Sequence, residues 1–470
     1  MTCIAEAPAS HTLATDRLTE AFERQREAFD REGGLPLDVR RAQLKALRAL
    51  VKGKADAFAK AVCGDFGWRS PHETLIAEIG VLLAAVDYAL PRLSKWAKPE
   101  RVGVGWRFWP AKGMILKQPL GVVGVLAPWN YPVQLALMPV VAALAAGCRA
   151  LVKPSELTPA TSALLADGIG DAFAPEILAA VTGGPDVAAA MTRLPFDSLI
   201  FTGSGRVGRQ VMAAAAENLT PVVLELGGKS PAIIDETADI DAAAATIVAG
   251  KLLNAGQTCI APDYVLVPRR LRDTFVEACQ AAARRLYPDP DGSDYTAIRG
   301  DSARERLVRL QQGLDAIPLF DRTLPPPKLT PVILRDPPAR SAVMQEEIFG
   351  PILPVVSYDA PVEAIATVNA RPKPLALYWF GRDRARLRPI LEHTLSGGVA
   401  VNETILHAAV EALPFGGVGA SGFGAYHGRA GFDAFTHRRA VLFQGRWSGT
   451  KVLRPPYGAL AGRLLKHLIR

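Results

Sequence analysis

Apolar residues in the first part of the chain recur at helical spacing. Leu18, Phe22 and Phe29 are separated by charged residues, and VRRAQLKALRALVKGKADAFAKAV continues this amphipathic pattern to residue 62. A third helix is predicted around HETLIAEIGVLLAAVDYAL. The next segment, GVGWRFWPAKGMILKQPLG, alternates instead, and its glycines, proline and bulky aromatics are typical of a β-hairpin.

From residue 120 the pattern changes to short apolar runs that alternate with helical segments of about ten to fifteen residues. The predicted strands include GVVGVLAP, CRALVKP, ILAAVTG, DSLIFTGS and PVVLELGGKSP. Such alternation predicts βαβ units and an α/β fold with a doubly wound parallel sheet. A second α/β region begins near residue 229. The Pro-rich segment LFDRTLPPPKLTPVILRDPP favours loop and linker.

One apolar stretch, residues 120–147, is long enough to suggest a membrane span. It is interrupted by Pro128, Asn130, Pro132, Gln134 and Pro139. Because a spanning helix does not tolerate this many interruptions, we expect a buried strand, a loop and a buried helix.

Composition places the chain among globular proteins. The 470 residues exceed one ordinary core, and 49% are hydrophobic against 21% charged. The net charge of +8 is spread along the chain, and no basic stripe interleaved with aromatics occurs, which argues against a nucleic-acid partner. Attraction to an anionic cofactor or substrate accounts for the charge.

Cysteine usage indicates a reducing compartment. The five cysteines are Cys3, Cys63, Cys148, Cys259 and Cys279. Their odd number, wide spacing and lack of a C-x-x-C or Cys/His cluster argue against a disulfide framework and a metal site. The N-terminus lacks the pattern of a secretory signal, so we expect a cytoplasmic protein.

Three segments hold residues suited to one chemistry. Cys259, in NAGQTCIAPDY, is a candidate nucleophile, although a small buried thiol remains the alternative. Glu225 lies between Leu224 and Leu226, and its partial desolvation would raise its pKa and suit it as a general base. Asn130 sits in the proline-bounded loop PWNYP, where a fixed amide can stabilise an oxyanion.

Two strand ends are candidate cofactor contacts. FTGSGRVG joins a strand to a helix through small residues that let backbone N–H groups approach a phosphate, but its spacing is not G-x-G-x-x-G. Lys153 and Glu156 follow another strand end, where a ligand commonly binds in an open parallel sheet. A plain strand–helix turn and a solvated helix start remain the alternatives.

Seven ordered motifs connect these segments. They are PWNYP, KPSE, FTGS, ELGGK, GQTC, EEIFGP and PFGGVGASGFG, between residues 128 and 424. In this order they resemble the NAD(P)-dependent aldehyde dehydrogenase superfamily. The segments VNETILH and YHGRAGF and the tail PPYG are similar to bacterial coniferyl aldehyde dehydrogenases of its class-3-like branch. One departure is a shortened stretch between Gln312 and Arg340, away from the motifs.

The resemblance implies a domain organisation. Residues 1–228 would form a cofactor-binding domain with an oligomerisation hairpin at about 102–118. Residues 229–415 would form the catalytic domain, and residues 416–470 would return to the cofactor domain and supply an oligomerisation strand and a tail helix. It also implies a homodimer.

The resemblance assigns roles to single residues. Cys259 would be the nucleophile, Glu225 the deacylating base and Asn130 an oxyanion donor together with the Cys259 backbone N–H. Tyr131 and Phe415 would line the substrate pocket. The implied cofactor-binding residues are Trp129, Lys153, Glu156, Gly203, Ser204, Gly208, Glu347 and Phe349.

The implied reaction is oxidation of an aldehyde to a carboxylic acid through a cysteine thiohemiacetal and thioester. We expect NAD as cofactor, with NADP as the alternative. The neighbours Thr258, Ile260 and Ala261 include no cation, which favours an aromatic or apolar aldehyde such as coniferyl aldehyde. Long-chain aldehyde oxidation, CoA acylation and a non-catalytic binding role are alternatives; the presence of Glu225 argues against acylation.

The C-terminal segment YGALAGRLLKHLIR predicts an amphipathic helix. Its apolar stripe comprises Leu460, Leu464, Leu465, Leu468 and Ile469, and residues 451–470 contain no acid. About a dozen residues cannot span a bilayer. We expect this helix to cover apolar surface near the substrate entrance or on a dimer partner, with contact to an anionic membrane surface as the alternative.

Overall fold

The computed structural model describes residues 8–446, 448, 450–451 and 454–469. Its α-helices are α1 (Pro8–Glu32), α2 (Leu37–Gly53), α3 (Ala55–Phe66), α4 (Pro71–Thr74), α5 (Val81–Ala97), α6 (Gln134–Ala146), α7 (Pro159–Ala172), α8 (Pro185–Thr192), α9 (Gly205–Ala216), α10 (Ile240–Leu252), α11 (Arg272–Leu286), α12 (Asp301–Gln311), α13 (Ala342–Gln345), α14 (Pro361–Asn369), α15 (Arg384–His393), α16 (Gly428–Ala434) and α17 (Ala459–Leu468). Its strands are β1 (Glu100–Val102), β2 (Lys112–Pro119), β3 (Val122–Leu126), β4 (Arg149–Lys153), β5 (Leu178–Ala180), β6 (Ser198–Gly203), β7 (Val222–Leu226), β8 (Pro231–Ile234), β9 (Tyr264–Pro268), β10 (Ala316–Pro318), β11 (Val332–Arg335), β12 (Ile352–Tyr358), β13 (Ala376–Phe380), β14 (Gly398–Val401), β15 (Gly422–Phe423) and β16 (Thr436–Phe443).

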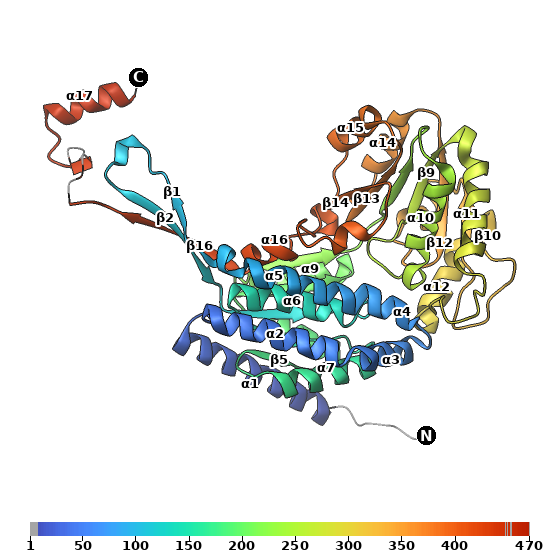
Figure 1. Ribbon diagram of the computed structural model, residues 1–470, viewed down its shortest axis with the longest axis horizontal. Helices are drawn as coiled ribbons and strands as arrows, with labels where there is room; N and C mark the ends of the chain where they lie inside the picture. Colours follow the sequence, from blue (N-terminus) through green and yellow to red (C-terminus); the bar gives the residue numbers. More distant parts are fainter. Residues whose placement is uncertain (1–7, 447, 449, 452–453, 470) are drawn as a thin grey trace.

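The strands form three sheets (Figure 1). A six-stranded sheet has the order β15-β7-β6-β3-β4-β5, in which β15 alone is antiparallel to its neighbour. A seven-stranded sheet has the order β10-β11-β12-β9-β8-β13-β14 and draws its strands from residues 231–401. The third sheet, β1-β2-β16, forms an arm that projects from the body. Whether the first two sheets and their helices fold as separate domains stays a prediction.

Helices cover both faces of the six-stranded sheet, as the alternating pattern predicted. On β3, Val122 and Leu126 pack with residues of α1, α8 and α9, whereas Val123 and Val125 pack with residues of α2, α5 and α6. A parallel strand covered on both faces needs apolar residues at successive positions, and all five residues of β3 are buried.

The prediction for the Pro-rich segment after residue 319 was partly wrong. Its four residues Val332–Arg335 form β11, which pairs in parallel with β12 and antiparallel with β10. Pro331, Pro337 and Pro338 flank this strand. Proline has no backbone N–H, and outside the strand this loss removes no hydrogen bond of the sheet. The number of prolines concealed a short apolar run between them.

The interrupted apolar stretch folds as predicted into β3, a loop and the fully buried helix α6. Another segment, Pro71–Ala97, is long and apolar enough to cross a membrane by length and composition alone. Its α5 portion packs on α2, α6 and α16, and Leu82, Leu93 and Trp96 are buried there. In this fold the segment therefore behaves as a helix of the protein core.

The predicted hairpin is present as β1 and β2, paired from Glu100↔Ile115 to Val102↔Gly113. Strand β16 pairs with the other edge of β2 over eight residues, so the arm joins segments more than 300 residues apart. Helix α17 lies at the far end of this arm (Figure 1). It therefore covers no surface near the two sheets of its own chain, and cover by a partner stays a prediction.

Candidate active site

The Cys259 loop begins with a sharp backbone turn. Asn254, Ala255 and Gly256 have φ angles of 52°, 51° and 75°, a conformation that residues other than glycine adopt at a cost of about 1–3 kcal/mol each. Glycine is required at position 256 because a Cβ there would lie 2.4 Å from the Gly350 carbonyl oxygen. The turn ends α10 and directs the chain towards Cys259 and then β9.

Buried side chains hold this turn. Glu73 accepts a hydrogen bond from the Asn254 backbone N–H at 3.1 Å and another from the Thr296 hydroxyl at 2.6 Å. The Gln257 amide donates to the carbonyls of Asn254 and Ala297, both at 3.0 Å. These bonds fix the loop from several directions, so the half-buried Cys259 is presented on a rigid backbone.

Glu225 lies on β7, and its predicted desolvation is confirmed. Only 2% of the residue is exposed, and within the described structure neither carboxylate oxygen has a hydrogen-bond partner. Burial raises the pKa of Glu225 well above its usual value. A carboxylate held without partners in an apolar site is a stronger base than one in water.

Cys259 is electrostatically coupled to two carboxyl groups. Burial, together with the charges of Glu347 and Glu225, raises the pKa of the Cys259 thiol to about 12. The resting form is therefore the thiol. Because the thiolate is the nucleophile, the thiol must give up its proton before or during its attack on a substrate.

Asn130 follows β3 in a loop that packs against the Cys259 loop. The Asn130 side-chain amide donates to the Gln257 backbone carbonyl at 3.1 Å. The Asn130 backbone carbonyl accepts from the Asn254 side-chain amide at 3.0 Å. An amide NH2 carries two hydrogens, so one remains for an oxyanion near Cys259. The structure thus joins the loop of the predicted donor to the loop of the predicted nucleophile by hydrogen bonds.

A buried ion pair that the sequence did not reveal supports this loop. Arg69 and Glu78 are fully buried and lie 3.0 Å apart, and Arg69 also donates to the Asn130 carbonyl at 3.0 Å. Glu78 accepts from the N–H groups of Val133 and Gln134 at the start of α6. Arg69 lies between two predicted helices and Glu78 within the second of them, and neither sequence neighbourhood indicates that the charge is buried.

A second buried pair positions the EEIFGP segment. Lys229 pairs with Asp263 and donates to the carbonyls of Val343 and Glu346 at 2.8 Å. Asp263 accepts from the Ile348 N–H at 2.9 Å. The end of the Cys259 loop is therefore tied to both sides of Glu347. The motif ELGGK contains Lys229, but only the fold shows that this lysine holds the EEIFGP segment.

The predicted cofactor residues lie at neighbouring strand ends. Lys153 ends β4 and forms an ion pair with Glu156 at 2.7 Å. Gly203 ends β6, and Ser204 caps α9 by accepting from the Val207 N–H at 3.4 Å. Because β3, β4, β6 and β7 are parallel, these ends meet at one edge of the sheet, where ligands bind in such folds.

Close packing between α9 and β7 explains the glycine at position 208. A Cβ at Gly208 would lie 2.7 Å from the Leu226 side chain, so glycine lets α9 approach β7. This brings the N-terminus of α9, whose first N–H groups lack intrahelical acceptors, towards the strand end that carries Glu225.

Glu347 and Phe349 face the same region. The Glu347 carboxylate packs on Gly227, where a Cβ would lie 2.1 Å from its Oε1 atom, and this oxygen has no partner among the described residues. Burial and the charge of Asp263 raise the pKa of Glu347 to about 7. The rings of Phe349 and Trp129 meet edge to face with centroids 5.7 Å apart.

The candidate substrate residues come from two segments. The Tyr131 hydroxyl shares a hydrogen bond of 2.7 Å with Thr258, next to Cys259. Phe415 stacks on His427 at 4.9 Å and contacts the rings of Tyr426 and His407. These ring contacts do not include Cys259, so the place of Phe415 in the substrate pocket stays a prediction.

These observations fit a dinucleotide. The glycine-bounded strand end before α9 suits a pyrophosphate, Lys153 and Glu156 offer partners for ribose hydroxyls, and the unpartnered Glu347 oxygen offers another. Within the described ranges no group of three or more His, Cys, Asp or Glu residues is placed to hold a metal ion. The role of each residue towards a cofactor stays a prediction.

The sequence matches the aldehyde dehydrogenase family over residues 3–441. A probable coniferyl aldehyde dehydrogenase of Pseudomonas aeruginosa is 46% identical, with 96% of each chain covered. The 4,4'-diaponeurosporen-aldehyde dehydrogenase of Staphylococcus aureus is 38% identical over 94% of this chain and 96% of the relative.

Solved structures agree with these sequences. A substrate-bound state of Staphylococcus aureus AldH has a TM-score of 0.92 and 37% identity, and covers 96% of this chain and 99% of that chain. A Mycobacterium tuberculosis aldehyde dehydrogenase complexed with NAD+ has a TM-score of 0.83 and 29% identity, and covers 92% and 91%. The sequence, the fold and the assembled site agree, and the chain belongs to the aldehyde dehydrogenase family of NAD(P)-dependent oxidoreductases.

Proposed function

We propose that this enzyme oxidises aromatic aldehydes of the coniferyl aldehyde type, with NAD preferred. The observation that carries the proposal is the setting of Cys259: the Tyr131 hydroxyl lies 2.7 Å from that of Thr258, the residue before Cys259, and Glu225 is buried without a partner among the described residues. Two relatives named as probable or established coniferyl aldehyde dehydrogenases, 46% and 39% identical, support the substrate class.

In the proposed mechanism the Cys259 thiol gives its proton to the carboxylate of Glu225 or Glu347, and its sulfur attacks the aldehyde carbonyl carbon. The second amide hydrogen of Asn130 and the Cys259 backbone N–H stabilise the oxyanion. A nicotinamide bound beside Cys259, with Glu347 as a candidate partner for its ribose, would supply the hydride acceptor for the oxidation of the thiohemiacetal to a thioester. Glu225 then takes a proton from water as its oxygen attacks the thioester, and the sulfur leaves as the acid is released.

Oxidation of a long apolar aldehyde is the second candidate. The staphylococcal relative named for 4,4'-diaponeurosporen-aldehyde supports it. CoA acylation is disfavoured because Glu225, the proposed deacylating base, is in place and buried.

A substrate panel tests the proposal. Coniferyl aldehyde and benzaldehyde should give higher kcat/KM than long-chain aldehydes or semialdehydes. The sequence neighbours Thr258, Ile260 and Ala261 carry no cation that could bind the second carboxylate of a semialdehyde. NADH formation is followed by absorbance, and CoA is added to separate tubes to detect an acyl-CoA product. A preference for long-chain aldehydes would favour the second candidate, and acyl-CoA formation would contradict hydrolysis.

The same panel tests cofactor choice. Glu156 is partly exposed and would repel a 2′-phosphate, but its ion pair with Lys153 offsets part of that charge. We therefore expect a higher kcat/KM for NAD than for NADP, and a smaller difference in E156Q. A wild-type enzyme that is more efficient with NADP would overturn this assignment.

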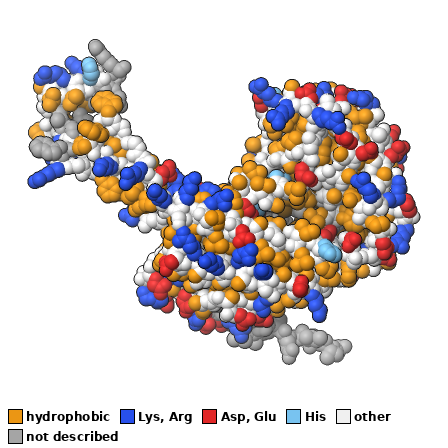
Figure 2. Space-filling view, viewed as in Figure 1, with side chains coloured by type: hydrophobic (Ala, Val, Ile, Leu, Met, Phe, Trp, Pro, Cys, Tyr) orange, Lys and Arg blue, Asp and Glu red, His pale blue; other side chains and the backbone are white. Residues whose placement is uncertain are grey.

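The arm supports a homodimer. Its sheet leaves β1 and β16 as unpaired edges, and Val102, Leu442 and Phe443 are exposed there. Apolar and basic side chains share its surface in Figure 2. Because exposed edges favour pairing with another chain, we expect light scattering to give a dimer mass at micromolar concentration. A monomer mass would contradict the proposal.

We propose that α17 docks on the partner subunit near its substrate entrance. Leu460, Leu464 and Leu465 are exposed on their own chain, whereas Ala461 is buried against it. Deleting residues 456–470, or the change L464D, should lower thermal stability or alter KM for bulky aldehydes without lipid, while K466Q should not. If the truncated enzyme keeps both properties but no longer sediments with anionic vesicles, α17 binds membranes instead. We also propose a cytoplasmic location for the protein, because its described cysteines are free, as is usual in a reducing compartment.

A further inference from the structure

Tyr378 of β13 connects the Cys259 loop to a segment much later in the chain. The residue is fully buried, and burial raises its pKa above the usual value, so its hydroxyl keeps the proton. That hydroxyl donates to the backbone carbonyl of Ile260 at 2.5 Å and accepts from the backbone N–H of Ile405 at 3.3 Å. One side chain therefore ties the residue after Cys259 to the segment that follows β14.

Ile405 holds a strained backbone conformation in this segment. Its φ and ψ angles of 61° and −44° lie in a region that a β-branched residue rarely adopts. The buried Thr404 next to it donates its hydroxyl hydrogen to the Thr246 carbonyl of α10 at 3.2 Å. A strained residue persists only where its surroundings hold it. The hydrogen bond from Ile405 to Tyr378 is part of that hold.

The same segment reaches the predicted wall of the substrate pocket. His407 follows Ile405 by two residues, and its ring centroid lies 5.9 Å from that of Tyr378 and 6.4 Å from that of Phe415. Contacts therefore run without a break from the Cys259 loop through Tyr378 and His407 to Phe415.

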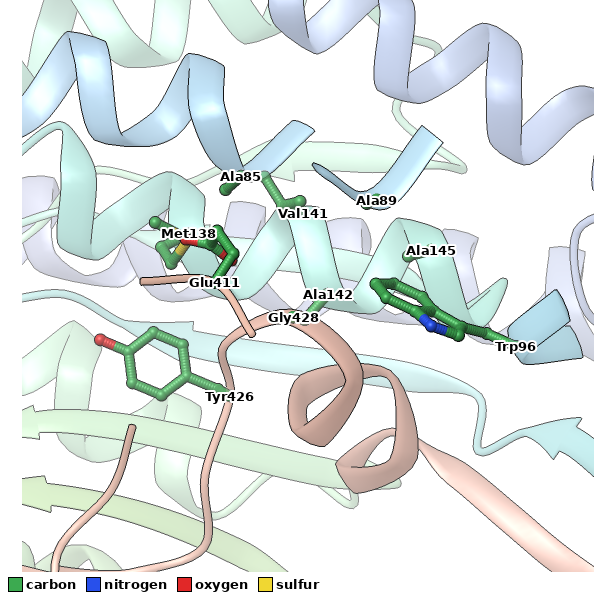
Figure 3. A pocket seen from close by; sticks show the side chains of 10 residues that line it. All are labelled: Ala85, Ala89, Trp96, Met138, Val141, Ala142, Ala145, Glu411, Tyr426 and Gly428. Carbon is green, nitrogen blue, oxygen red and sulfur yellow. The ribbon is translucent and has the colours of Figure 1, made fainter. Parts of the chain in front are cut away.

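Phe415 is also packed on its other side. Its ring stacks on His427 at 4.9 Å and meets the ring of Tyr426 edge to face at 6.2 Å. Figure 3 shows Tyr426 among the residues around a cavity of about 10 Å³, which is close to what one water requires. Because this packing leaves little space behind Phe415, the contacts through Tyr378 determine where the wall stands relative to Cys259.

We propose that Tyr378 is a positioning residue that holds the Phe415 wall at a fixed distance from Cys259 and so determines which aldehydes the pocket accepts. This inference rests on the proposed function and on Phe415 as a pocket wall. A bulky aromatic aldehyde that reaches Phe415 needs the wall and the nucleophile at matching positions. A small aldehyde that occupies only the space near the sulfur does not.

The test compares Y378F with wild type on a bulky and a small aldehyde. Phenylalanine keeps the ring but removes the hydroxyl and both of its hydrogen bonds. We expect KM for coniferyl aldehyde to rise about tenfold, the effect of a small mismatch in an apolar pocket. The kcat for coniferyl aldehyde, and both constants for propanal, should stay close to wild type. NADH absorbance measures all four constants.

Y358F is the matched control. Tyr358 is a buried tyrosine of β12 in the same sheet, and its hydroxyl donates to the Ile234 carbonyl at 2.6 Å. This variant also loses a buried hydrogen bond, so it should lower thermal stability comparably and leave KM for both aldehydes unchanged. A similar rise in KM for coniferyl aldehyde in Y358F, or an equal rise for both aldehydes in Y378F, would show a general structural effect and overturn the proposal.

H407A tests the same connection while Tyr378 keeps its hydroxyl. It removes the ring between Tyr378 and Phe415, so KM should again rise for coniferyl aldehyde and not for propanal. In F415A the wall is absent, and adding Y378F should raise KM no further. A further rise would contradict action through the wall.

An unchanged KM for coniferyl aldehyde in Y378F overturns the proposal and leaves the proposed function standing. H407A gives the same decision if Y378F does not fold. A wild-type enzyme that oxidises propanal but not coniferyl aldehyde overturns the proposed substrate class and this inference together.

Discussion

Replacing Cys259 with alanine should abolish aldehyde oxidation while leaving NAD binding intact. The variant removes the sulfur that forms both covalent intermediates, and loss of a nucleophile typically lowers kcat by on the order of 10⁶-fold. The candidate dinucleotide contacts lie on β4, β6 and α9, so they should not change. NADH absorbance measures the turnover, and quenching of protein fluorescence by NAD measures binding.

A second thiol provides the control. Cys63 is also half-buried, but it lies on α3, away from the Cys259 loop. C63A should oxidise aldehydes at the wild-type rate. Near wild-type turnover by C259A would remove Cys259 from the mechanism and with it the proposed function.

Glu225→Gln should slow steady-state turnover by on the order of 10²–10⁴-fold, the usual contribution of a general base. Glutamine matches the size of the buried side chain but cannot take a proton from water. Hydride transfer precedes this step, so the variant should still form a burst of NADH and then stop at the thioester. Rapid mixing with absorbance detection separates the two phases.

The pH dependence gives a second test of this base. Burial raises the pKa of Glu225 above its usual value, and the carboxylate is the active form. Below that pKa the group is protonated and inactive, so wild-type turnover should rise with pH through it. E225Q should lack this rise. Unchanged turnover with an unchanged pH profile in E225Q would show that another group, such as Glu347, takes the proton.

The sequence predicted those features of the fold and the site that depend on residues adjacent in the chain. Successive apolar residues such as Val122 to Leu126 predicted a strand covered on both faces, because such a strand needs apolar side chains at every position. Leucines on both sides of Glu225 predicted its desolvation for the same local reason. The four-residue β11 was missed because flanking prolines outweighed its short apolar run.

Tertiary structure decided which distant residues act together. Ion pairing between Arg69 and Glu78, which holds the Asn130 loop, depends on burying both charges in one place, and neither sequence neighbourhood shows that burial. Sequence alone therefore predicted the strand–helix alternation from local polarity, and it predicted the candidate nucleophile and base from the ordered motifs. The buried ion pairs that support the site depend on contacts between segments far apart in the chain, which no local pattern of residues reveals.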